Sequence, residues 1–331
     1  VNFLKKLNLE DVVNESSVIN EISCAKIENY KVNQKFQLNF NEKNSELGRV
    51  VYNKILNEKL NYIISENKNI KLFKNINIQD CKFLKKDNIL ILDNGEKIYT
   101  KILIIAEKKI NLIDENFKDN FIKKDLKQTS LVLDVKSKTN NHAYQFFTKK
   151  GALAYLPINE NLASVIWSLD NDSDELQYNK EDILHEINDI FKNTIFCEKV
   201  IDMQKYSLKF EYAKKTISGP IILIGDAAHS LHPIAGQGLN LSIKDITELK
   251  KKIEKYNYLG YDLGNSSSLG EYENIRKADN IFYTFSTTYL DELFKSRNFF
   301  LNKISNIGIK VVEKNSTIKK LIIESATGQK H

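Results

Sequence analysis

The segment IILIGDAAHSLHPIAGQGLNLSIKD, residues 221–245, carries the clearest chemical pattern of the chain. The ionised carboxylate of Asp226 can only accept hydrogen bonds, so it suits a sugar or polyol hydroxyl better than a phosphate. Gly236 and Gly238 open a predicted helix, whose unpaired N–H groups and dipole favour an anion or an electron-rich carbonyl. Glycine also lets a planar ligand approach the main chain closely. One ligand would need both features.

The elements around this pattern predict where that ligand lies. Residues 221–224 are all apolar and indicate a buried parallel strand that delivers Asp226 to its carboxyl end. Ligands of α/β sheets bind at that edge of the sheet. The sequence after Gly238 predicts a helix, whose apolar face is expected to contain Leu239, Leu241, Ile243, Ile246, Leu249 and Ile253.

This segment resembles the second flavin-binding motif of the class A FAD-dependent aromatic monooxygenases, in the branch that hydroxylates ubiquinone precursors. The resemblance implies that Asp226 holds the ribityl chain of FAD. It also implies that the helix start faces the pyrimidine edge of the isoalloxazine, where N–H groups stabilise the negative charge of reduced flavin. The cofactor-binding residues expected in this motif are Gly225, Asp226, Pro233, Gly236, Gln237, Gly238, Leu239 and Asn240.

Two residues outside the motif complete the expected FAD site by the same resemblance. Arg49, at the start of a predicted helix, is expected near the FAD phosphates, with Lys54 further along; two solvated cations are the alternative. Glu107 takes the place of the Asp in a second family fingerprint near the pyrophosphate, and a purely structural role is its alternative. Lys108 stands where that fingerprint has a glycine, a residue that adopts a positive φ readily.

The two histidines of the motif, His229 and His232, invite a metal or general-base role. Their spacing is not that of a zinc-binding helix, and no carboxylate partner is evident in the sequence. A packing or turn role beside the flavin is the stronger expectation. We assign no catalytic residue and no metal site, since the cofactor carries the chemistry in such enzymes.

The beginning of the chain departs from the resembled family. VNFLKKLNLEDVV predicts a short amphipathic helix, and no GxGxxG follows a predicted strand. Gly260, Gly264 and Gly270 lack the fingerprint spacing and are expected in a loop. In the family, a segment like VNFLKKLNL comes directly after the GxGxxG unit. We therefore expect an N-terminally truncated member.

Composition narrows the function classes. A chain of 331 residues with 42% hydrophobic content can bury a core. The net charge is +6, and positively and negatively charged residues alternate along the chain. This mixed pattern disfavours nucleic-acid binding. Cys24, Cys81 and Cys197 lack CxxC spacing, which favours reduced thiols in a cytosolic compartment. No apolar run reaches the length of a membrane span and no signal-peptide pattern begins the chain, so we expect a cytoplasmic protein.

Three parts of the chain predict short strands. Residues 70–106 predict IKLFK, then ILIL with an Asp-Asn-Gly hairpin turn, then the buried run IYTKILIIA. Residues 17–40 and 129–170 predict the strands of a substrate domain, and in 129–170 we expect three: TSLVLDVKS, AYQFFTKKGALAYLPI and ASVIWSL. The segment 181–191 predicts an amphipathic helix with His185 on its surface.

Aromatic residues of the substrate domain could line a pocket for an aromatic or prenylated substrate. Each of them alone is more often part of a core, so the expectation concerns the surface as a whole. The residues are Tyr144, Phe146, Phe147, Tyr155 and Trp167.

The predicted fold class is α/β: a Rossmann-like FAD-binding domain interrupted by an antiparallel β-sheet substrate domain and closed by C-terminal helices. The expected FAD-binding domain comprises residues 1–16, 46–125 and 216–260, and the substrate domain comprises 17–45 and 126–215. Residues 261–331 form the expected C-terminal helical region. Its ending, IGIKVVEKNSTIKKLIIESATG, suits a capping helix, or a peripheral docking surface for the inner face of a membrane or for partner enzymes.

By resemblance, the expected activity is that of an FAD-dependent NAD(P)H aromatic monooxygenase. It would hydroxylate a prenylated phenol in ubiquinone biosynthesis, using O₂ through a flavin C4a-hydroperoxide. One alternative is a noncatalytic homologue that serves as a subunit or scaffold of a quinone-biosynthesis complex. A second alternative is another flavoenzyme of the same fold, a reductase or a halogenase; halogenases need a Trp-rich motif, and this chain has only Trp167.

Overall fold

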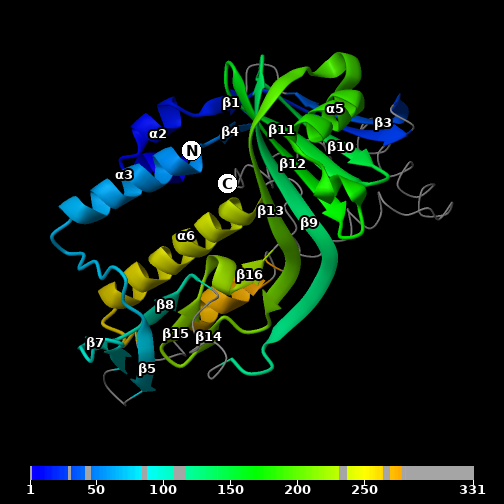
Figure 1. Ribbon diagram of the computed structural model, residues 1–331. Coiled ribbons are helices and arrows are strands. Elements are labelled where there is room, and N and C mark those ends of the chain that lie inside the picture. Colours follow the sequence, from blue (N-terminus) through cyan, green and yellow to red (C-terminus); the bar gives the residue numbers. More distant parts are fainter. Residues whose placement is uncertain are drawn as a thin grey trace. The chain divides into compact units, whose positions relative to one another are not determined.

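The computed structural model describes residues 2–28, 31–41, 46–83, 88–107, 117–139, 141–230, 237–263, 269–277 and 280. These residues form two compact units of mixed α/β structure (Figure 1). Unit 1 contains the described residues up to 68 and from 127 to 208, and unit 2 contains those from 69 to 126 and from 209 to 280. Each unit is therefore assembled from segments that lie far apart in the sequence.

A large sheet dominates unit 1. Its strand order is β13-β9-β12-β11-β10-β2-β3, in which β10 and β2 are parallel neighbours. β9 and β13 also run into unit 2, where β13 pairs with β16 (His229–Ser230). The seven strands are β2 (Glu21–Glu28), β3 (Lys31–Asn41), β9 (Phe121–Ser137), β10 (His142–Thr148), β11 (Gly151–Asn159), β12 (Leu162–Asp170) and β13 (Cys197–Ala213).

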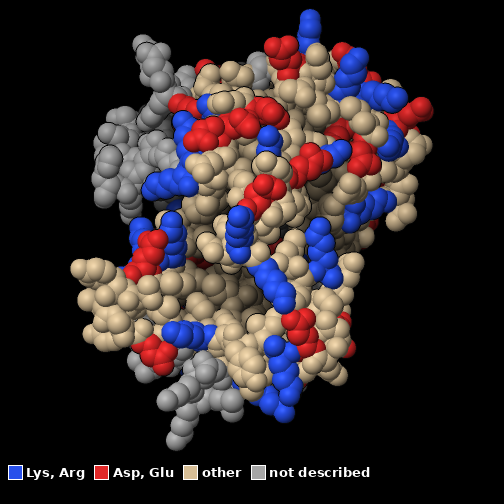
Figure 2. Space-filling model, turned by 90° about the vertical axis from the view of Figure 1, so that its left-hand side faces the viewer, with Lys and Arg blue, Asp and Glu red and all other residues tan. Residues whose placement is uncertain are grey.

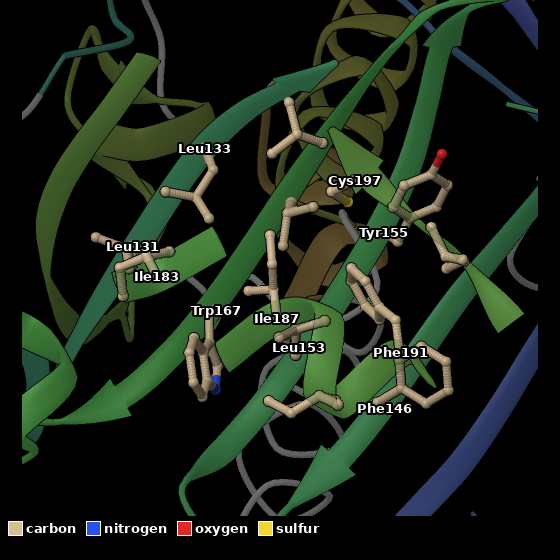
Figure 3. Packing of buried hydrophobic residues seen from close by; sticks show 14 of the residues in the cluster. Leu131, Leu133, Phe146, Leu153, Tyr155, Trp167, Ile183, Ile187, Phe191 and Cys197 are labelled. Carbon is tan, nitrogen blue, oxygen red and sulfur yellow. The ribbon is translucent and has the colours of Figure 1, made fainter. Parts of the chain in front are cut away.

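Helix α5 (Lys180–Phe191) packs on one face of this sheet and forms the main core of unit 1 (Figure 3). The Asn179 side chain accepts hydrogen bonds from two N–H groups of its first turn, which caps the helix. The predicted helix is confirmed, and His185 is exposed. Short 3₁₀ helices, η1 (Asp174–Gln177) and η2 (Lys192–Thr194), flank it. The core includes Leu131, Leu133, Leu153, Tyr155, Val165, Trp167, Ile183 and Ile187.

β10 and β11 form a tight hairpin, where the sequence predicted one strand through AYQFFTKKGALAYLPI. The Thr148 hydroxyl accepts hydrogen bonds from the N–H groups of Lys150 and Gly151 in the turn. Gly151 has a φ of +144°, and a Cβ there would lie 1.7 Å from the Ser168 carbonyl oxygen. Only glycine lets β11 begin so close to β12. The single-strand prediction was wrong, because the chain reverses direction between Thr148 and Gly151.

The N-terminal residues of unit 1 form a small core of their own. Leu9, Val12 and Leu56 are buried there. The helix that was predicted to start near Arg49 starts later than expected. Val50 is the last residue of strand β4, and the helix begins at Asn53. The elements are α1 (Asn2–Lys6), α2 (Glu10–Asn14), β1 (Ser17–Ile19), β4 (Gly48–Val50) and α3 (Asn53–Glu66), with β1 and β4 paired antiparallel.

Unit 2 contains a three-stranded antiparallel sheet of β5 (Ile78–Phe83), β6 (Asn88–Leu92) and β7 (Lys97–Thr100). The predicted hairpin turn is confirmed: Gly95 has a φ of +82°, and its N–H donates to the Leu92 carbonyl. The strand predicted for IKLFK was wrong, since residues 70–74 have no strand structure. The run IYTKILIIA is divided between β7 and a further strand, β8 (Leu103–Ile105).

β8 lies parallel to β15 (Ile221–Leu223), which also pairs with β14 (Ile217–Ser218). β15 is buried on both faces: Ile221 and Leu223 pack beside β8, and Ile222 packs towards Leu249. The predicted buried strand is therefore confirmed. It leads into the 3₁₀ turn η3 (Gly225–Ala227), and further on the chain forms α6 (Gln237–Tyr258) and a helix over 269–277. Gly270 lies in that last helix, not in the loop that was predicted for it.

Candidate functional site

The turn after β15 carries the first part of the candidate site. Gly225 is buried and has a φ of +54°, a conformation that favours glycine. Asp226 follows it in η3 and is exposed. Within the described part of the chain, no hydrogen bond or ion pair engages the Asp226 carboxylate. This carboxylate can therefore accept hydrogen bonds from hydroxyl groups of a ligand.

Glu107 belongs to the same sheet edge as Asp226. β8 and β15 run parallel, with Ile105 opposite Leu223, and the Ile224 N–H donates to the Ile105 carbonyl at 3.0 Å. Glu107 follows β8 by two residues and is exposed. The two acidic residues thus emerge at the carboxyl ends of neighbouring parallel strands, where α/β sheets bind ligands. Lys108 lies outside the described residues.

The first turn of α6 provides the third part of the site. The helix begins at Gln237, and Gly238, Leu239 and Asn240 are exposed. Among the described residues, no atom lies within 4 Å of a Cβ built at Gly238, so these residues leave the backbone open to a close ligand. Leu239, which was predicted on the apolar face of the helix and among the cofactor-binding residues, is 52% exposed. Pro233, Gly236 and His232 lie outside the described residues.

Arg49 lies in unit 1 and has structural partners there. Its guanidinium makes a bidentate ion pair with Glu46 at 2.8 Å for each contact, and donates to the Val13 carbonyl at 2.7 Å. These bonds join the end of α2 to β4. Lys54, in the first turn of α3, is exposed. The contact of Arg49 with the FAD phosphates stays a prediction.

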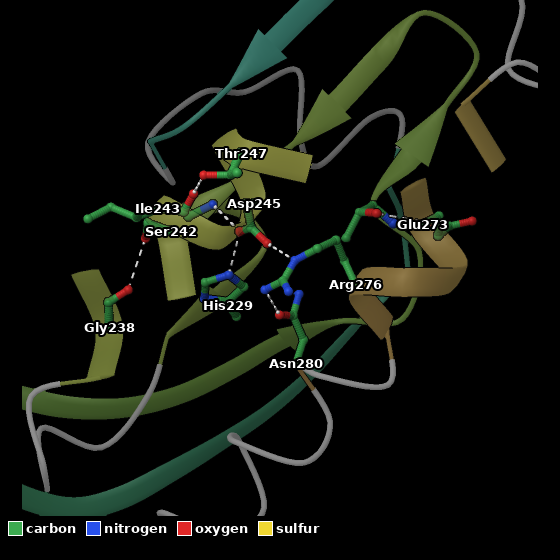
Figure 4. A network of polar contacts seen from close by, with 11 residues as sticks. His229, Gly238, Ser242, Ile243, Asp245, Thr247, Glu273, Arg276 and Asn280 are labelled. Carbon is green, nitrogen blue, oxygen red and sulfur yellow. Dashed lines mark hydrogen bonds and ion pairs between the residues drawn. The ribbon is translucent and has the colours of Figure 1, made fainter. Parts of the chain in front are cut away.

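A buried polar network contacts the turn that carries Asp226, and Figure 4 shows its members Asp245, His229, Arg276 and Asn280. The Asp245 carboxylate, on α6, accepts hydrogen bonds from the Gly225 N–H at 3.0 Å and from His229 Nε2 at 2.7 Å. Arg276 Nε donates to its other oxygen at 2.8 Å, and Arg276 also bonds to Asn280. Burial alone would raise the pKa of Asp245, but His229 and Arg276 hold that pKa below its ordinary value.

Sequence reasoning missed Asp245 and Arg276 as members of the site. His229 has the packing role that was expected, and its carboxylate partner is Asp245. One signal was present: Asp245 lies four residues from Leu241 and from Leu249, which are both buried on α6. A carboxylate in the middle of an apolar helix stripe predicts a buried cation opposite it.

The predicted aromatic lining mostly belongs to the core of unit 1. Phe146, Tyr155 and Trp167 are 3%, 1% and 0% exposed and pack with α5. Tyr144 and Tyr155 do line a cavity of about 260 Å³. Its remaining walls come from Lys138, Thr194, Ile195, Phe196 and Glu198, so it lies at the end of the sheet near η2.

Two further features of the described residues concern surface charge and metal ligands. Lys and Arg side chains are interspersed with Asp and Glu over the face in Figure 2. The described residues contain no group of three or more His, Cys, Asp or Glu side chains that could hold a metal ion. The same part of the chain contains no helix that is both long and apolar enough to cross a membrane.

The residues of unit 2 fit FAD. A free carboxylate, an open glycine and an exposed apolar side chain suit the ribityl chain and the edge of a planar ring system. Residues 118–278 match the family model described as an FAD binding domain. This match includes Asp226, the start of α6, Asp245 and Arg276.

Curated relatives agree with this match. The chain is 22% identical to the ubiquinone biosynthesis monooxygenase COQ6 of Dictyostelium discoideum, over 99% of this chain and 79% of that protein. It is 26% identical to the ubiquinone hydroxylase UbiL of Rhodospirillum rubrum, over 72% of this chain and 56% of the relative. The chain therefore spans about half to four-fifths of the length of these relatives.

Solved structures share the fold. The p-nitrophenol 4-monooxygenase PnpA from Pseudomonas putida aligns with a TM-score of 0.74 and 13% identity, over 100% of this chain and 87% of that one. HpxO from Klebsiella pneumoniae, solved with FAD and uric acid, aligns with a TM-score of 0.74 and 12% identity, over 98% and 85%. The α/β prediction is confirmed. Residues 118–278 are thus similar to an FAD binding domain, the chain is similar to ubiquinone-biosynthesis hydroxylases over most of its length, and its fold is that of solved FAD-dependent monooxygenases.

Proposed function

We propose that the protein is an FAD-dependent monooxygenase that hydroxylates a prenylated phenol in ubiquinone biosynthesis, with NAD(P)H and O₂ as co-substrates. The observation that carries this proposal is the pair of exposed carboxylates, Asp226 and Glu107, at the carboxyl ends of adjacent parallel strands. They lie within a chain whose relatives are named as ubiquinone hydroxylases. A noncatalytic scaffold would have no use for an open, solvent-facing cofactor edge.

The chain's own residues bind and orient the cofactor. Asp226 would accept hydrogen bonds from hydroxyl groups of the ribityl chain, and N–H groups of the first turn of α6 would face the pyrimidine edge. Negative charge at that edge is stabilised by the positive end of the helix dipole. Glu107 would lie near the pyrophosphate. When bound, FAD supplies the electron transfer and the oxygen chemistry.

The substrate would occupy the face of the unit 1 sheet that does not pack against α5. Side chains alternate between the two faces of a strand, so neighbours of core residues point to this face. Val132, Leu156 and Ile166 lie next to buried residues in the sequence and are themselves partly exposed. These apolar side chains would contact the prenyl group. Water exclusion by such a surface protects the oxygen-transfer step.

Partners and location form a finer part of the proposal. The C-terminal sequence is apolar and basic, which suits peripheral contact with the inner face of a membrane or docking into a quinone-biosynthesis complex. Both possibilities place the enzyme where prenylated intermediates are found. Binding to vesicles of anionic lipid, measured by flotation with and without residues 305–331, tests the membrane contact.

Flavin binding tests the cofactor assignment. We expect Asp226→Ala in the full-length protein to weaken FAD binding about tenfold to hundredfold, because charge-assisted hydrogen bonds are lost. Its melting temperature without FAD should not change, since Asp226 is exposed. Glu254→Ala is the matched control: it removes another exposed carboxylate near the far end of α6. Unchanged flavin content in Asp226→Ala would sink the assignment of the motif.

Oxygen incorporation tests the reaction. The holoenzyme is mixed with NADPH, a prenylated phenol and ¹⁸O₂, and the product is analysed by mass spectrometry. The proposal expects phenol-stimulated NADPH oxidation and one ¹⁸O atom in the product. NADPH oxidation without incorporated ¹⁸O would identify a reductase instead. A protein that binds FAD but never oxidises NADPH or NADH would favour the noncatalytic alternative.

A further inference from the structure

One oxygen atom holds both ends of the segment that carries Asp226. Asp245 Oδ2 accepts the Gly225 N–H at 3.0 Å and His229 Nε2 at 2.7 Å. Gly225 precedes Asp226 directly, and His229 follows it by three residues. The short segment between these two bonds is closed by the Ala228 N–H, which donates to the Gly225 carbonyl at 2.9 Å. Two hydrogen bonds to one carboxylate therefore hold the backbone on either side of Asp226, and Figure 4 shows the bonds of Asp245 with His229 and Arg276.

That carboxylate is itself held in place from the other side. Arg276 Nε donates to Asp245 Oδ1 at 2.8 Å, and Arg276 Nη2 donates to Asn280 Oδ1 at 2.8 Å. Asp245, Arg276 and Asn280 are 0%, 1% and 2% exposed. With bonds to both carboxylate oxygens, the Asp245 side chain has one orientation. The helix over 269–277 thereby fixes the turn after β15.

Asp245 also connects the turn to the helix start. It lies on α6 seven residues after Gly238, and about two helical turns separate them, so both lie on similar sides of the helix. The side chain that grips the Asp226 segment therefore belongs to the same rigid element as the first turn of α6. This link is one of the contacts between α6 and η3 that set the spacing between the Asp226 carboxylate and that turn.

Stability alone does not account for such a network. Burying a carboxylate and a guanidinium costs desolvation energy, and apolar residues of similar volume are often as stabilising. The apolar residues nearby, such as Leu241 and Leu249 on α6, show that this helix can pack without charge. What an apolar core would lack is a fixed hydrogen-bond acceptor for the Gly225 N–H. The network therefore specifies position.

We propose that Asp245, oriented by Arg276 and joined by His229, is a positioning residue that sets the Asp226 turn against the first turn of α6 for FAD binding. This inference rests on the proposed function. Asp245 need not touch FAD, and its effect on the cofactor passes through Asp226.

A double-mutant cycle tests this dependence. FAD dissociation constants are measured by quenching of flavin fluorescence for the wild-type holoprotein, Asp226→Ala, Asp245→Asn and the double variant. We expect Asp245→Asn to weaken FAD binding about tenfold, the equivalent of one net hydrogen bond. In the double variant we expect the same affinity as in Asp226→Ala, because the turn has no carboxylate left to position. Losses that multiply in the double variant would overturn the proposal.

A structural control separates positioning from general destabilisation. Leu249→Ala opens a cavity under α6, and Leu249 makes none of the network's hydrogen bonds. Each variant is titrated with FAD well below its own melting temperature. We expect Leu249→Ala to bind FAD within about twofold of the wild type, since folded stability and cofactor geometry are separate quantities. An equal loss in Leu249→Ala and Asp245→Asn would make the network merely structural.

A second pair of variants covers the case in which Asp245→Asn does not fold. His229→Gln keeps an N–H donor for Asp245, and His229→Ala removes it. We expect His229→Gln to retain the FAD affinity and the visible flavin spectrum, and His229→Ala to weaken the affinity about tenfold. Equal behaviour of the two variants would contradict the proposal. A wild-type protein that binds no FAD would instead remove the proposed function itself.

Discussion

Both units contain apolar cores, but unit 2 also contains a buried ion pair beside its apolar clusters. The core between the large sheet and α5 is predominantly apolar, with Leu131, Leu153, Trp167 and Ile187 fully buried. The residues that pack against the turn after β15 include a charged pair, Asp245 and Arg276, which is as deeply buried as those apolar side chains. Apolar contacts are not directional, whereas hydrogen bonds fix the angles between groups. The first core therefore gives stability to a sheet, and the second gives a defined position to a turn.

This difference follows what each region has to hold. A sheet face tolerates small shifts of its side chains, because packing can readjust. A carboxylate that binds a cofactor hydroxyl must lie within a few tenths of an ångström of one place. In this chain the apolar core therefore lies under the proposed substrate sheet, and the charged core lies under the proposed cofactor turn.

The largest expected loss of stability comes from the apolar core. Trp167→Ala should reduce the free energy of unfolding by about 3–5 kcal/mol, because a large cavity replaces a fully buried ring. Urea unfolding followed by circular dichroism measures this. Ile166→Ala, on the opposite face of β12, is the control and should cost less. Equal costs would show that the α5 side is not the main core.

A smaller substitution at the same position sharpens this prediction. Among the described residues, Trp167 Nε1 has no hydrogen-bond partner. Trp167→Phe therefore loses packing but no hydrogen bond, and it should cost clearly less than Trp167→Ala. A cost for Trp167→Phe as large as that for Trp167→Ala would point to a polar role of the indole.

The charged core should respond to acid, and the apolar core should not. The pKa of Asp245 is lowered in the folded protein, so the unfolded chain takes up the proton first as the pH falls. Its stability contribution is complete above the ordinary carboxyl pKa of about 4 and is lost as the pH falls through the folded value. Each unit of pKa shift corresponds to about 1.4 kcal/mol.

Unfolding measurements between about pH 6 and pH 3 test this sign. The decline in stability should be flatter in Asp245→Asn than in the wild type. Trp167→Ala should keep the wild-type pH dependence, shifted down uniformly. An unchanged slope in Asp245→Asn would mean that other carboxyl groups dominate the acid response.

Substitutions at Gly225, in the turn after β15, and at Gly238, in the first turn of α6, should differ in their effect on stability. Gly225→Ala places a side chain at a φ of +54°, with its Cβ 3.1 Å from Ser242 Oγ, and should cost about 1–2 kcal/mol in stability. Gly238→Ala meets no atom within 4 Å and should leave stability unchanged or slightly increased. Thermal unfolding without FAD measures both. A destabilised Gly238→Ala would contradict the open surface.

Gly238→Ala, which should leave stability unchanged, is nevertheless expected to change the affinity for FAD. Gly238→Ala places a methyl group at the surface proposed to face the flavin, so it should weaken FAD binding although the fold is intact. Flavin fluorescence titration of the two variants provides the measurement. Full affinity in Gly238→Ala would place the cofactor away from the start of α6.

The parts of the fold that sequence predicted well are local in origin. The strand at 221–224, the turn at Asp226 and helix α6 depend on residues that are neighbours in the chain. The β10–β11 hairpin was missed, because FTKKGALAY lacks the Asn-Gly or Asp-Gly pair that marks tight turns. What places the turn at Gly151 is the approach of Ser168, which is a tertiary contact.

The candidate site shows the same limit. Asp226 and Gly238 were predicted because their motif is contiguous. Asp245 and Arg276 lie 31 residues apart, and only the fold brings them together. Arg49 was assigned to a helix start, but Val50 and Val51 suit a strand as well as a helix. The pairing of β4 with β1 decided between the two.

The smallest expected effect comes from an ion pair on the surface. Lys59 on α3 contacts Asp11 at 3.1 Å, as close as many buried pairs, but the two side chains are 43% and 72% exposed. Water screens both charges, so Lys59→Ala should change the free energy of unfolding by less than about 1 kcal/mol. Urea unfolding of Lys59→Ala, Asp11→Ala and the double variant measures the coupling. A coupling as large as that of Asp245 with Arg276 would show that burial is not what distinguishes the charged core.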